Sequence, residues 1–344
     1  MKVLVTGGTG FIGSHTVVEL QKAGFEVVAM DNFENSAPSV IENIKTITGK
    51  NFHFYEADIR NKAALDKIFT DHSDIEAVIH FAAYKSVNES VEKPLAYYEN
   101  NVGGTVNLVE VMQKHGVKNL VFSSSCTVYG DVSVDALPIT EDSPVVKANS
   151  PYGNTKKICE ELLYDTAKAS TTRIVALRYF NPIGAHDSAL IGELPNGVPN
   201  NLIPFVTQTA IGIREKLTVF GNDYPTRDGS CIRDFIHVVD LAKAHVKAIE
   251  YFDKSADSYS VFNIGTGTGN TVLEAIHAFE KVSSTKLNYQ IGDRRPGDVV
   301  QIYASCDKAI NVLGWQAERT LENSLETAWK WELHLKQLRE QAVN

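Results

Sequence analysis

Cysteine is scarce in this 344-residue chain, which has four, at Cys126, Cys159, Cys231 and Cys306. They lie far apart and form no Cys-x-x-Cys pair or His-rich segment of the kind that ligates zinc. The small number and the wide spacing also argue against the disulfide framework of a secreted protein. We therefore expect no bound metal and a reducing, cytoplasmic location.

The sequence also lacks long apolar runs and an excess of basic residues. No apolar run reaches the length of a membrane-spanning helix. The formal net charge is −9 and the basic residues are scattered, which argues against general attraction to nucleic acid or anionic lipid. A strand is already expected at residues 2–6, which leaves no room for a signal peptide. We expect no nucleic-acid partner and no membrane partner.

Short apolar segments alternate with potential helices through the first half of the chain. In a parallel sheet such segments are buried between helices on both faces, and ligands gather at the carboxyl ends of the strands. The pattern predicts an α/β fold with a Rossmann-type doubly wound parallel sheet. The expected strands are residues 3–6, 26–30, 52–55, 77–81, 119–122 and 173–177.

The alternation weakens after residue 181, where the chain becomes rich in Pro, Gly and Asn. This change in pattern predicts a nucleotide-binding domain of residues 1–180, to which residues 235–266 return. It also predicts a second, smaller α/β substrate domain in residues 181–344. The elements expected in this second half are helices near 202–213, 238–251 and 320–338 and strands at 217–220 and 261–264.

Gly7, Gly10 and Gly13 form a Gly-x-x-Gly-x-x-Gly motif between the first expected strand and a helix expected at 11–23. Glycines have no Cβ atom, so backbone amides and the positive end of the helix can approach a pyrophosphate. Glycine triplets in isolation are often only turns. The strand that precedes this motif and the helix that follows it favour a dinucleotide site.

Asp31 closes the second expected strand. Its carboxylate can accept hydrogen bonds from both ribose hydroxyls of NAD and would repel the additional phosphate of NADP. The alternative is a solvated aspartate in a turn. No Arg or Lys follows at Asn32 or Phe33, so we predict NAD as the cofactor. Further cofactor contacts are expected after the third and fourth strands, at Asp58, Ile59, Phe81, Ala82 and Ala83.

Tyr152 and Lys156 are the candidates for proton transfer. A tyrosine with a pKa near 10 is a poor base at neutral pH, so a nearby positive charge is needed to lower that pKa. Residues i and i+4 share a helix face, and the ammonium of Lys156 can therefore stand near the Tyr152 hydroxyl. Tyr164 and Lys168 repeat the spacing, but only Tyr152 stands at the start of the expected helix, near the ligand edge of the sheet.

Three consecutive serines, 123–125, end the fifth expected strand. One of their hydroxyls could bond the reacting oxygen and pass a proton to Tyr152. The alternative for each is a serine that satisfies turn backbone. Lys85 and Asn181 are polar candidates near other strand ends, and a surface lysine and a turn asparagine are the alternatives for them.

These motifs together resemble the extended short-chain dehydrogenases/reductases and, more narrowly, the UDP-glucose 4-epimerase family, also called UDP-galactose 4-epimerases. The resemblance runs over nearly the whole chain. Its early segments mark the superfamily and its later segments the narrower group. The strongest segments are 6–13, 31–36, 123–130, 151–156, 177–182, 199–202, 220–226, 233–238 and 295–298.

The resemblance implies Tyr152 as the acid/base, Lys156 as the residue that lowers its pKa, and Ser125 as the serine that assists proton transfer. It implies an NAD site made of Gly7, Gly10, Phe11, Ile12, Gly13, Asp31, Asn32, Asn35, Ser36, Asp58, Ile59, Phe81, Ala82, Ala83, Lys85, Asn100, Ser123, Tyr152, Lys156 and Tyr179. It implies a UDP-hexose site made of Lys85, Ser125, Tyr152, Phe180, Asn181, Asn201, Leu202, Thr218, Phe220, Arg233, Arg295, Asp298 and Ile302.

The implied reaction is reversible epimerisation of UDP-glucose and UDP-galactose at C4, through a transient 4-keto sugar and tightly bound NAD, as in galactose metabolism. UDP must be held firmly and the hexose loosely, because the keto sugar has to turn over. Ile302 stands where the family borders the sugar, and its intermediate size leaves UDP-GlcNAc and UDP-GalNAc open as substrates. A homodimer through helices 94–115 and 152–169 is implied as well.

Three alternative functions are weighed against this one. A nucleotide-sugar 4,6-dehydratase would need an acidic pair where Cys126 and Thr127 stand. A UDP-sugar decarboxylase or uronate epimerase would need only one further donor for the added carboxylate. An NAD-sensing regulator would not require Tyr152 and Lys156 together.

Overall fold

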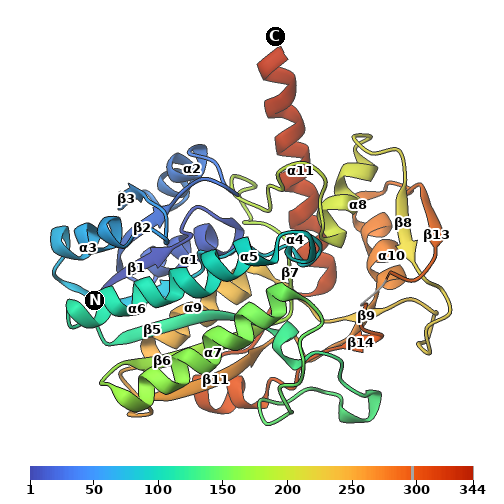
Figure 1. The fold of residues 1–344 in the computed structure, drawn as a ribbon. Helices are drawn as coiled ribbons and strands as arrows, with labels where there is room; N and C mark the ends of the chain where they lie inside the picture. Colours follow the sequence, from blue (N-terminus) through green and yellow to red (C-terminus); the bar gives the residue numbers. More distant parts are fainter. Residues whose placement is uncertain (296–297, 344) are drawn as a thin grey trace.

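Seven parallel strands form the main sheet of the protein (Figure 1). The computed structural model describes residues 1–295 and 298–343. The strand order is β3-β2-β1-β4-β5-β6-β11, whose first six strands have the Rossmann order. The predicted doubly wound α/β fold is therefore confirmed. The strands are β1 (Lys2–Thr6), β2 (Glu26–Asp31), β3 (His53–Glu56), β4 (Ile75–His80), β5 (Asn119–Ser125), β6 (Arg173–Tyr179) and β11 (Tyr259–Ile264).

Helices cover both faces of this sheet. Successive side chains of a strand point to opposite faces, so Val3 and Val5 of β1 enter one hydrophobic core and Leu4 enters the other. The first core lies under α1 (Phe11–Lys22), α2 (Ser39–Thr48) and α9 (Val238–Tyr251). The second lies under α3 (Lys62–Asp71), α6 (Gly104–Lys114) and α7 (Pro151–Ala169).

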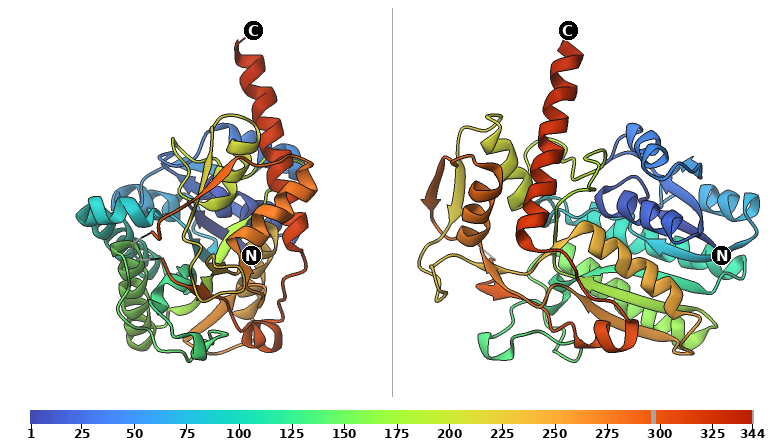
Figure 2. Two further views of the ribbon diagram at one scale, coloured as in Figure 1. Left: turned by 90° about the vertical axis from the view of Figure 1, so that its right-hand side faces the viewer. Right: turned by 180° about the vertical axis from the view of Figure 1, so that it is seen from behind.

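A smaller group of elements lies beside the main sheet (Figure 2). Ile203, Phe279 and Leu325 belong to its hydrophobic core. The last helix passes through this group, and its carboxyl end projects beyond the rest of the molecule. The elements are β7 (Asn181–Ile183), α8 (Leu202–Ala210), β8 (Leu217–Phe220), β9 (Ile232–Arg233), β10 (Phe235–His237), β12 (Asn270–Thr271), α10 (Val272–Ser283), β13 (Tyr289–Gly292), β14 (Gln301–Ile302) and α11 (Leu321–Val343).

The chain returns to the main sheet between elements of this smaller group. Strand β11 pairs in parallel with β6, with Tyr259 opposite Ile174, and α9 packs beside α1. The division of the chain into two domains at residue 180 stays a prediction. No helix formed by residues 1–295 or 298–343 is both long and apolar enough to cross a membrane.

One expected helix is interrupted in the structure, one is shorter than expected, and the last, expected at 320–338, continues to Val343. The helix expected at 94–115 is divided into α5 (Pro94–Tyr97), the π-helical segment η1 (Tyr98–Gly103) and α6. The helix expected at 202–213 ends at Ala210, because Gly212 turns the chain with a φ of +86°. The other short helices are α4 (Val87–Glu92), η2 (Cys126–Tyr129), η3 (Val134–Ala136) and η4 (Ala309–Leu313).

Candidate active site

The turn from β1 to α1 has the geometry of an anion site. Gly7 has a φ of +69°, and a Cβ atom on Gly13 would lie 2.0 Å from the Gly7 oxygen, so both positions need glycine. Gly10 is the N-cap of α1 and offers no side chain to the first-turn amides. Amides left in this way can bind phosphate oxygens at the positive end of the helix. The residues therefore fit a dinucleotide pyrophosphate.

Asp31 lies at the end of β2, beside this turn. Its carboxylate accepts hydrogen bonds from the amides of Thr9 (3.2 Å) and Phe33 (2.9 Å). It also accepts one from the Ser36 hydroxyl at 3.0 Å. These bonds hold the carboxylate at the edge of the glycine turn, where a ribose would follow the pyrophosphate. The neighbouring Asn35 is exposed.

The cofactor contacts expected after the third strand, Asp58 and Ile59, follow β3 in the structure. The Asn32 amide donates to Asp58 Oδ2 at 3.0 Å, and the Arg60 guanidinium donates to both oxygens of the same carboxylate, at 2.9 and 2.6 Å. The Arg60 hydrogen bonds hold the pKa of Asp58 well below its usual range. Ile59 is buried, and a Cβ atom on Gly104 of α6 would lie 2.6 Å from its Cγ2.

The loop after β4 lies against the glycine turn. The Phe81 amide donates to the Thr6 carbonyl at 3.1 Å, and a Cβ atom on Gly7 would come within 2.9 Å of the Ala82 nitrogen. Ala83 in the same loop is half-buried. This close packing places small residues and backbone beside the glycine turn, and their contact with a cofactor stays a prediction.

Tyr152 and Lys156 stand in the first turns of α7 and are both buried, with 7% and 3% of their surface exposed. Ser150 caps the helix by accepting from the Gly153 amide at 3.1 Å, and Pro151 occupies its first position. The Lys156 ammonium donates to the Ser123 carbonyl at 2.7 Å. This bond holds α7 to the carboxyl end of β5.

Burial has the largest effect on the pKa values of Tyr152 and Lys156. It lowers the pKa of Lys156 to about 8 and raises the pKa of Tyr152 above its ordinary value. The nearby Tyr179 raises the Tyr152 pKa further, whereas the Ser125 hydroxyl lowers it. Without a ligand the Tyr152 hydroxyl is therefore protonated at neutral pH. That Lys156 lowers the Tyr152 pKa stays a prediction for the ligand-bound protein.

The three serines at the end of β5 have different partners. Ser123 shares a hydrogen bond of 2.8 Å with the Tyr179 hydroxyl. Ser124 donates to Glu160, which also forms a buried ion pair with Arg178, so Ser124 belongs to a structural network. Ser125 accepts from the hydroxyl of Thr127 at 3.0 Å, and its influence on the Tyr152 pKa marks it as the serine beside Tyr152.

The π-helical segment η1 places two asparagines next to α7. Asn100 is buried and donates to Asn101 Oδ1 at 3.0 Å. Asn101, which we did not single out from the sequence, accepts from the Tyr84 amide at 2.8 Å and donates to the Thr155 hydroxyl at 3.0 Å. It thereby joins the loop after β4 to α7. The consecutive Asn-Asn pair was the only available signal.

The two arginines of the expected nucleotide site converge on one carboxylate. Arg233 and Arg295 donate to the same Asp298 oxygen at 3.4 and 2.6 Å. The Arg295 guanidinium lies 5.8 Å from the centre of the half-exposed Phe220 ring. Pro296 and Gly297 of this motif lie outside the described residues. Thr218, two residues before Phe220 on β8, accepts from the Gln290 amide at 3.4 Å.

The residues expected at the sugar occupy several elements. Phe180 and Ile302 are buried in one hydrophobic cluster, and Ile302 lies opposite Arg233 in the pairing of β14 with β9. Asn181 is half-buried on β7, and its amide donates to the Asp234 carbonyl at 2.9 Å. Leu202 begins α8 directly after Asn201.

Glu193 joins two of the expected substrate residues, and sequence reasoning missed it. Its Oε1 accepts from the Lys85 ammonium at 3.0 Å and from the Asn201 amide at 2.6 Å. Lys85 is 108 residues away in the sequence, so no local pattern could reveal this contact.

Known proteins resemble the chain along nearly its full length. Residues 3–265 match the NAD dependent epimerase/dehydratase family. The chain is 53% identical over 335 residues to the UDP-glucose 4-epimerase of Bacillus subtilis (strain 168), covering 96% of this chain and 97% of that protein.

Solved structures resemble the chain as well. One is the UDP-glucose-4-epimerase of Stenotrophomonas maltophila with bound NAD and formylated UDP-arabinopyranose, at 45% identity and a TM-score of 0.95, covering 98% of this chain and 99% of that one. Another is the UDP-glucose 4-epimerase of Bifidobacterium longum in complex with NAD+ and UDP, at 45% identity and a TM-score of 0.93, covering 97% and 98%.

Proposed function

The chain belongs to the NAD dependent epimerase/dehydratase family, and on that basis we propose that it interconverts UDP-glucose and UDP-galactose by inverting C4 of the hexose. NAD is the cofactor. The observation that carries the proposal is the meeting of Tyr152, Lys156 and Ser125 at the carboxyl edge of a sheet whose glycine turn fits a pyrophosphate.

Tyr152 exchanges a proton with the C4 hydroxyl in this proposal. Bound NAD supplies the acceptor and donor of the hydride at C4, and its oxidised ring brings a positive charge into the site. Ser125 stands beside Tyr152 and relays the proton to the sugar oxygen. Lys156 is fixed by the Ser123 carbonyl and supplies positive charge on the cofactor side.

The nucleotide and the sugar are held with unequal strength. Arg233 and Arg295 bring two guanidinium groups to one place in an otherwise acidic protein, where they bind the diphosphate. Asp298 accepts from a ribose hydroxyl. The hexose is bound loosely, because the 4-keto sugar must present its opposite face before the hydride returns.

The dehydratase alternative is poorly supported by the side chains available. Cys126 is buried, and burial raises the pKa of its thiol to about 12. The Thr127 hydroxyl donates a hydrogen bond to the Ser125 hydroxyl. Neither group is an acid–base catalyst at neutral pH. Cys126 and Thr127 therefore do not supply the acid and base that elimination of water after C4 oxidation needs.

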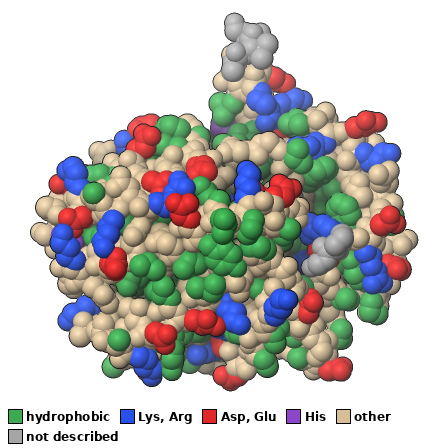
Figure 3. Space-filling model, in the orientation of Figure 1, with side chains coloured by type: hydrophobic (Ala, Val, Ile, Leu, Met, Phe, Trp, Pro, Cys, Tyr) green, Lys and Arg blue, Asp and Glu red, His purple; other side chains and the backbone are tan. Residues whose placement is uncertain are grey.

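We also propose that the protein is a cytoplasmic homodimer. Val87, Val91 and Leu95 of α4 and α5 are exposed, Leu95 by 82%, and Figure 3 shows hydrophobic side chains gathered over this part of the surface. A contiguous exposed apolar surface of this kind is typical of an interface. The scarce, unpaired cysteines support the cytoplasmic location.

The proposed reaction is tested by incubating the purified protein with UDP-galactose, UDP-glucose, UDP-GlcNAc or UDP-GalNAc, without added NAD. We expect UDP-galactose and UDP-glucose to be interconverted to the same equilibrium mixture from either side. The two N-acetylated substrates show whether a site bordered by Ile302 admits the larger sugar. No conversion of any substrate, with or without added NAD, would contradict the proposal.

A further inference from the structure

Glu193 joins a residue of the cofactor side to a residue of the substrate side. Lys85 follows β4 of the main sheet, and its ammonium lies 6.0 Å from the ring of Phe11 at the start of α1. Asn201 is the N-cap of α8 in the smaller group of elements. Both donate to the same Glu193 oxygen, at 3.0 and 2.6 Å. The Glu193 side chain is only 11% exposed, whereas that of Lys85 is 56% exposed.

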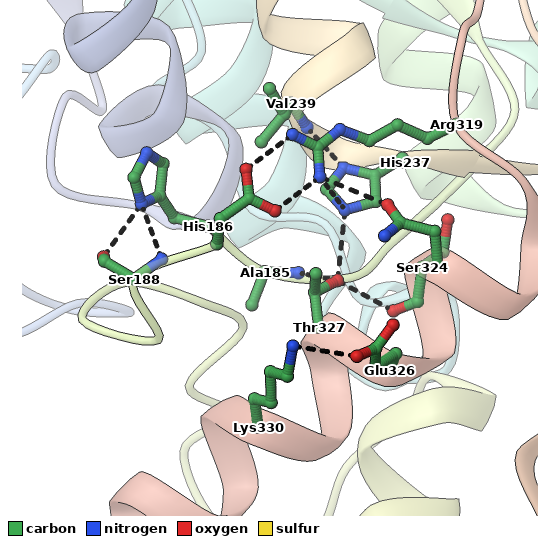
Figure 4. Close-up of polar contacts among 12 residues, drawn as sticks. Ala185, His186, Ser188, His237, Val239, Arg319, Ser324, Glu326, Thr327 and Lys330 are labelled. Atoms are coloured by element: carbon green, nitrogen blue, oxygen red, sulfur yellow. Dashed lines mark hydrogen bonds and ion pairs between the residues drawn. The ribbon is translucent and has the colours of Figure 1, made fainter. Parts of the chain in front are cut away.

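The backbone that carries Glu193 is anchored to α11. The Trp331 indole donates to the Glu193 carbonyl at 2.8 Å, and a Cβ atom on Gly192 would come within 2.5 Å of the same ring. Earlier in this segment the Ala185 amide donates to the Thr327 hydroxyl at 3.2 Å, as Figure 4 shows. The Glu193 carboxylate therefore extends from a backbone fixed by another element.

Attraction for the substrate does not account for the negative charge of Glu193. A carboxylate close to a bound diphosphate repels it, and Lys85 alone would attract the diphosphate more strongly. What the carboxylate adds is a shared acceptor, which fixes two flexible donors relative to each other. Ordering such donors before binding lowers the entropy cost of binding.

We propose that Glu193 is a positioning residue for the UDP-hexose, which sets the distance between Lys85 and Asn201 by accepting hydrogen bonds from both. The proposal rests on the proposed function and on the family resemblance, which places Lys85 and Asn201 at the UDP-hexose. Glu193 itself does not touch the reacting atoms. Its effect is on substrate binding, because the proton-transfer residues lie on α7 and β5.

The test compares Glu193→Ala with Glu193→Gln by calorimetric binding of UDP and by steady-state kinetics. We expect Glu193→Ala to raise the Kd of UDP and the KM of UDP-galactose by about tenfold, the loss of roughly one charged hydrogen bond, and to change kcat less than about threefold. Glu193→Gln keeps an oxygen acceptor for both donors, so its Kd and KM should stay within about threefold of wild type. Glu318→Ala, which removes the exposed partner of Lys243, is the matched control.

A double-mutant cycle with Asn201→Ala separates positioning from general destabilisation. If Glu193 acts through Asn201, the double variant binds UDP about as weakly as Asn201→Ala alone. Additive losses would contradict the proposal, and so would an unchanged Kd in Glu193→Ala or an equal loss in Glu193→Gln. Glu193→Ser, too short to reach either donor, is the second variant should alanine prevent folding.

Failure of the proposed function would be recognised separately. A wild-type protein that binds UDP but converts no UDP-hexose contradicts the epimerase reaction, whereas the UDP affinities of the Glu193 variants still test the positioning role.

Discussion

Burial disfavours the charged forms of Tyr152 and Lys156 in the ligand-free protein. Burial lowers the pKa of the ammonium to about 8 and raises that of the phenol. A bound cation therefore has to assist before Tyr152 can act as a base. This dependence links proton transfer to occupancy of the cofactor site, so that the phenol is not ionised when the coenzyme is absent.

Tyr152→Phe should lower kcat by roughly 100-fold or more and leave the Kd of UDP unchanged, because only the proton-transfer hydroxyl is removed. Initial rates with UDP-galactose and calorimetric titration with UDP measure the two effects. Tyr164→Phe is the matched control, since Tyr164 also precedes a lysine by four residues in α7 but is 46% exposed. Full activity in Tyr152→Phe would remove this residue from the mechanism.

The Lys156 pKa predicts a pH-dependent contribution to stability. Because the folded-state pKa of about 8 lies below the ordinary 10.5, protonation favours the unfolded state. The cost is largest below pH 8 and disappears as pH rises through 10.5. Lys156→Met removes the cost at every pH, so its stability gain over the wild type should be larger at pH 7 than at pH 9.5 by roughly 2 kcal/mol.

Urea unfolding of both ligand-free proteins at the two pH values measures this difference. Comparison of the variant with the wild type at each pH removes the contributions of the other titrating groups. A gain that is equal at both pH values, or larger at pH 9.5, would contradict the lowered pKa of Lys156.

Elements differ in how far the sequence alone could predict them. The strands and the turn after β1 have local signals, namely apolar segments and spaced glycines, and the Rossmann-type sheet follows from them. The helix expected at 94–115 is interrupted by η1, where buried asparagine contacts replace regular helical packing. Glu193 and the Glu160–Arg178 pair could not be predicted, since tertiary contacts alone bring their partners together. Roles within the candidate site stay predictions until they are tested.

Gly13→Ala should disrupt the turn between β1 and α1. The new Cβ atom would lie 2.0 Å from the Gly7 oxygen, so the turn must shift and the first-turn amides lose their alignment. We expect the NAD content of the purified protein to fall at least tenfold, as measured by acid release and enzymatic assay. Gly103→Ala is the control, because beyond its chain neighbours and its own helix no atom lies within 4 Å of its added Cβ. Normal NAD content in Gly13→Ala would contradict the placement of the pyrophosphate at this turn.

At the scale of the whole molecule, Leu95→Lys should weaken the proposed homodimer. Placing an unpaired charge in an apolar interface costs several kcal/mol, which corresponds to a rise of roughly 100-fold or more in the dimer dissociation constant. Sedimentation velocity over a range of protein concentrations measures the change. Val312→Lys, at a half-exposed position on η4, is the control. An unchanged dimer, or a monomeric wild type, would contradict the interface over α4 and α5.

The pairing of β11 with β6 also bears on how the protein is made. Until residue 264 has left the ribosome, the nascent chain has no β11 to cover the free edge of β6. Helix α9, which completes the core beside α1, emerges only shortly before. An uncovered strand edge invites pairing with other chains. Synthesis of the Rossmann segment is therefore followed by an interval in which the edge of β6 is open to pairing, and we expect a chain that ends near residue 180 to be prone to aggregation.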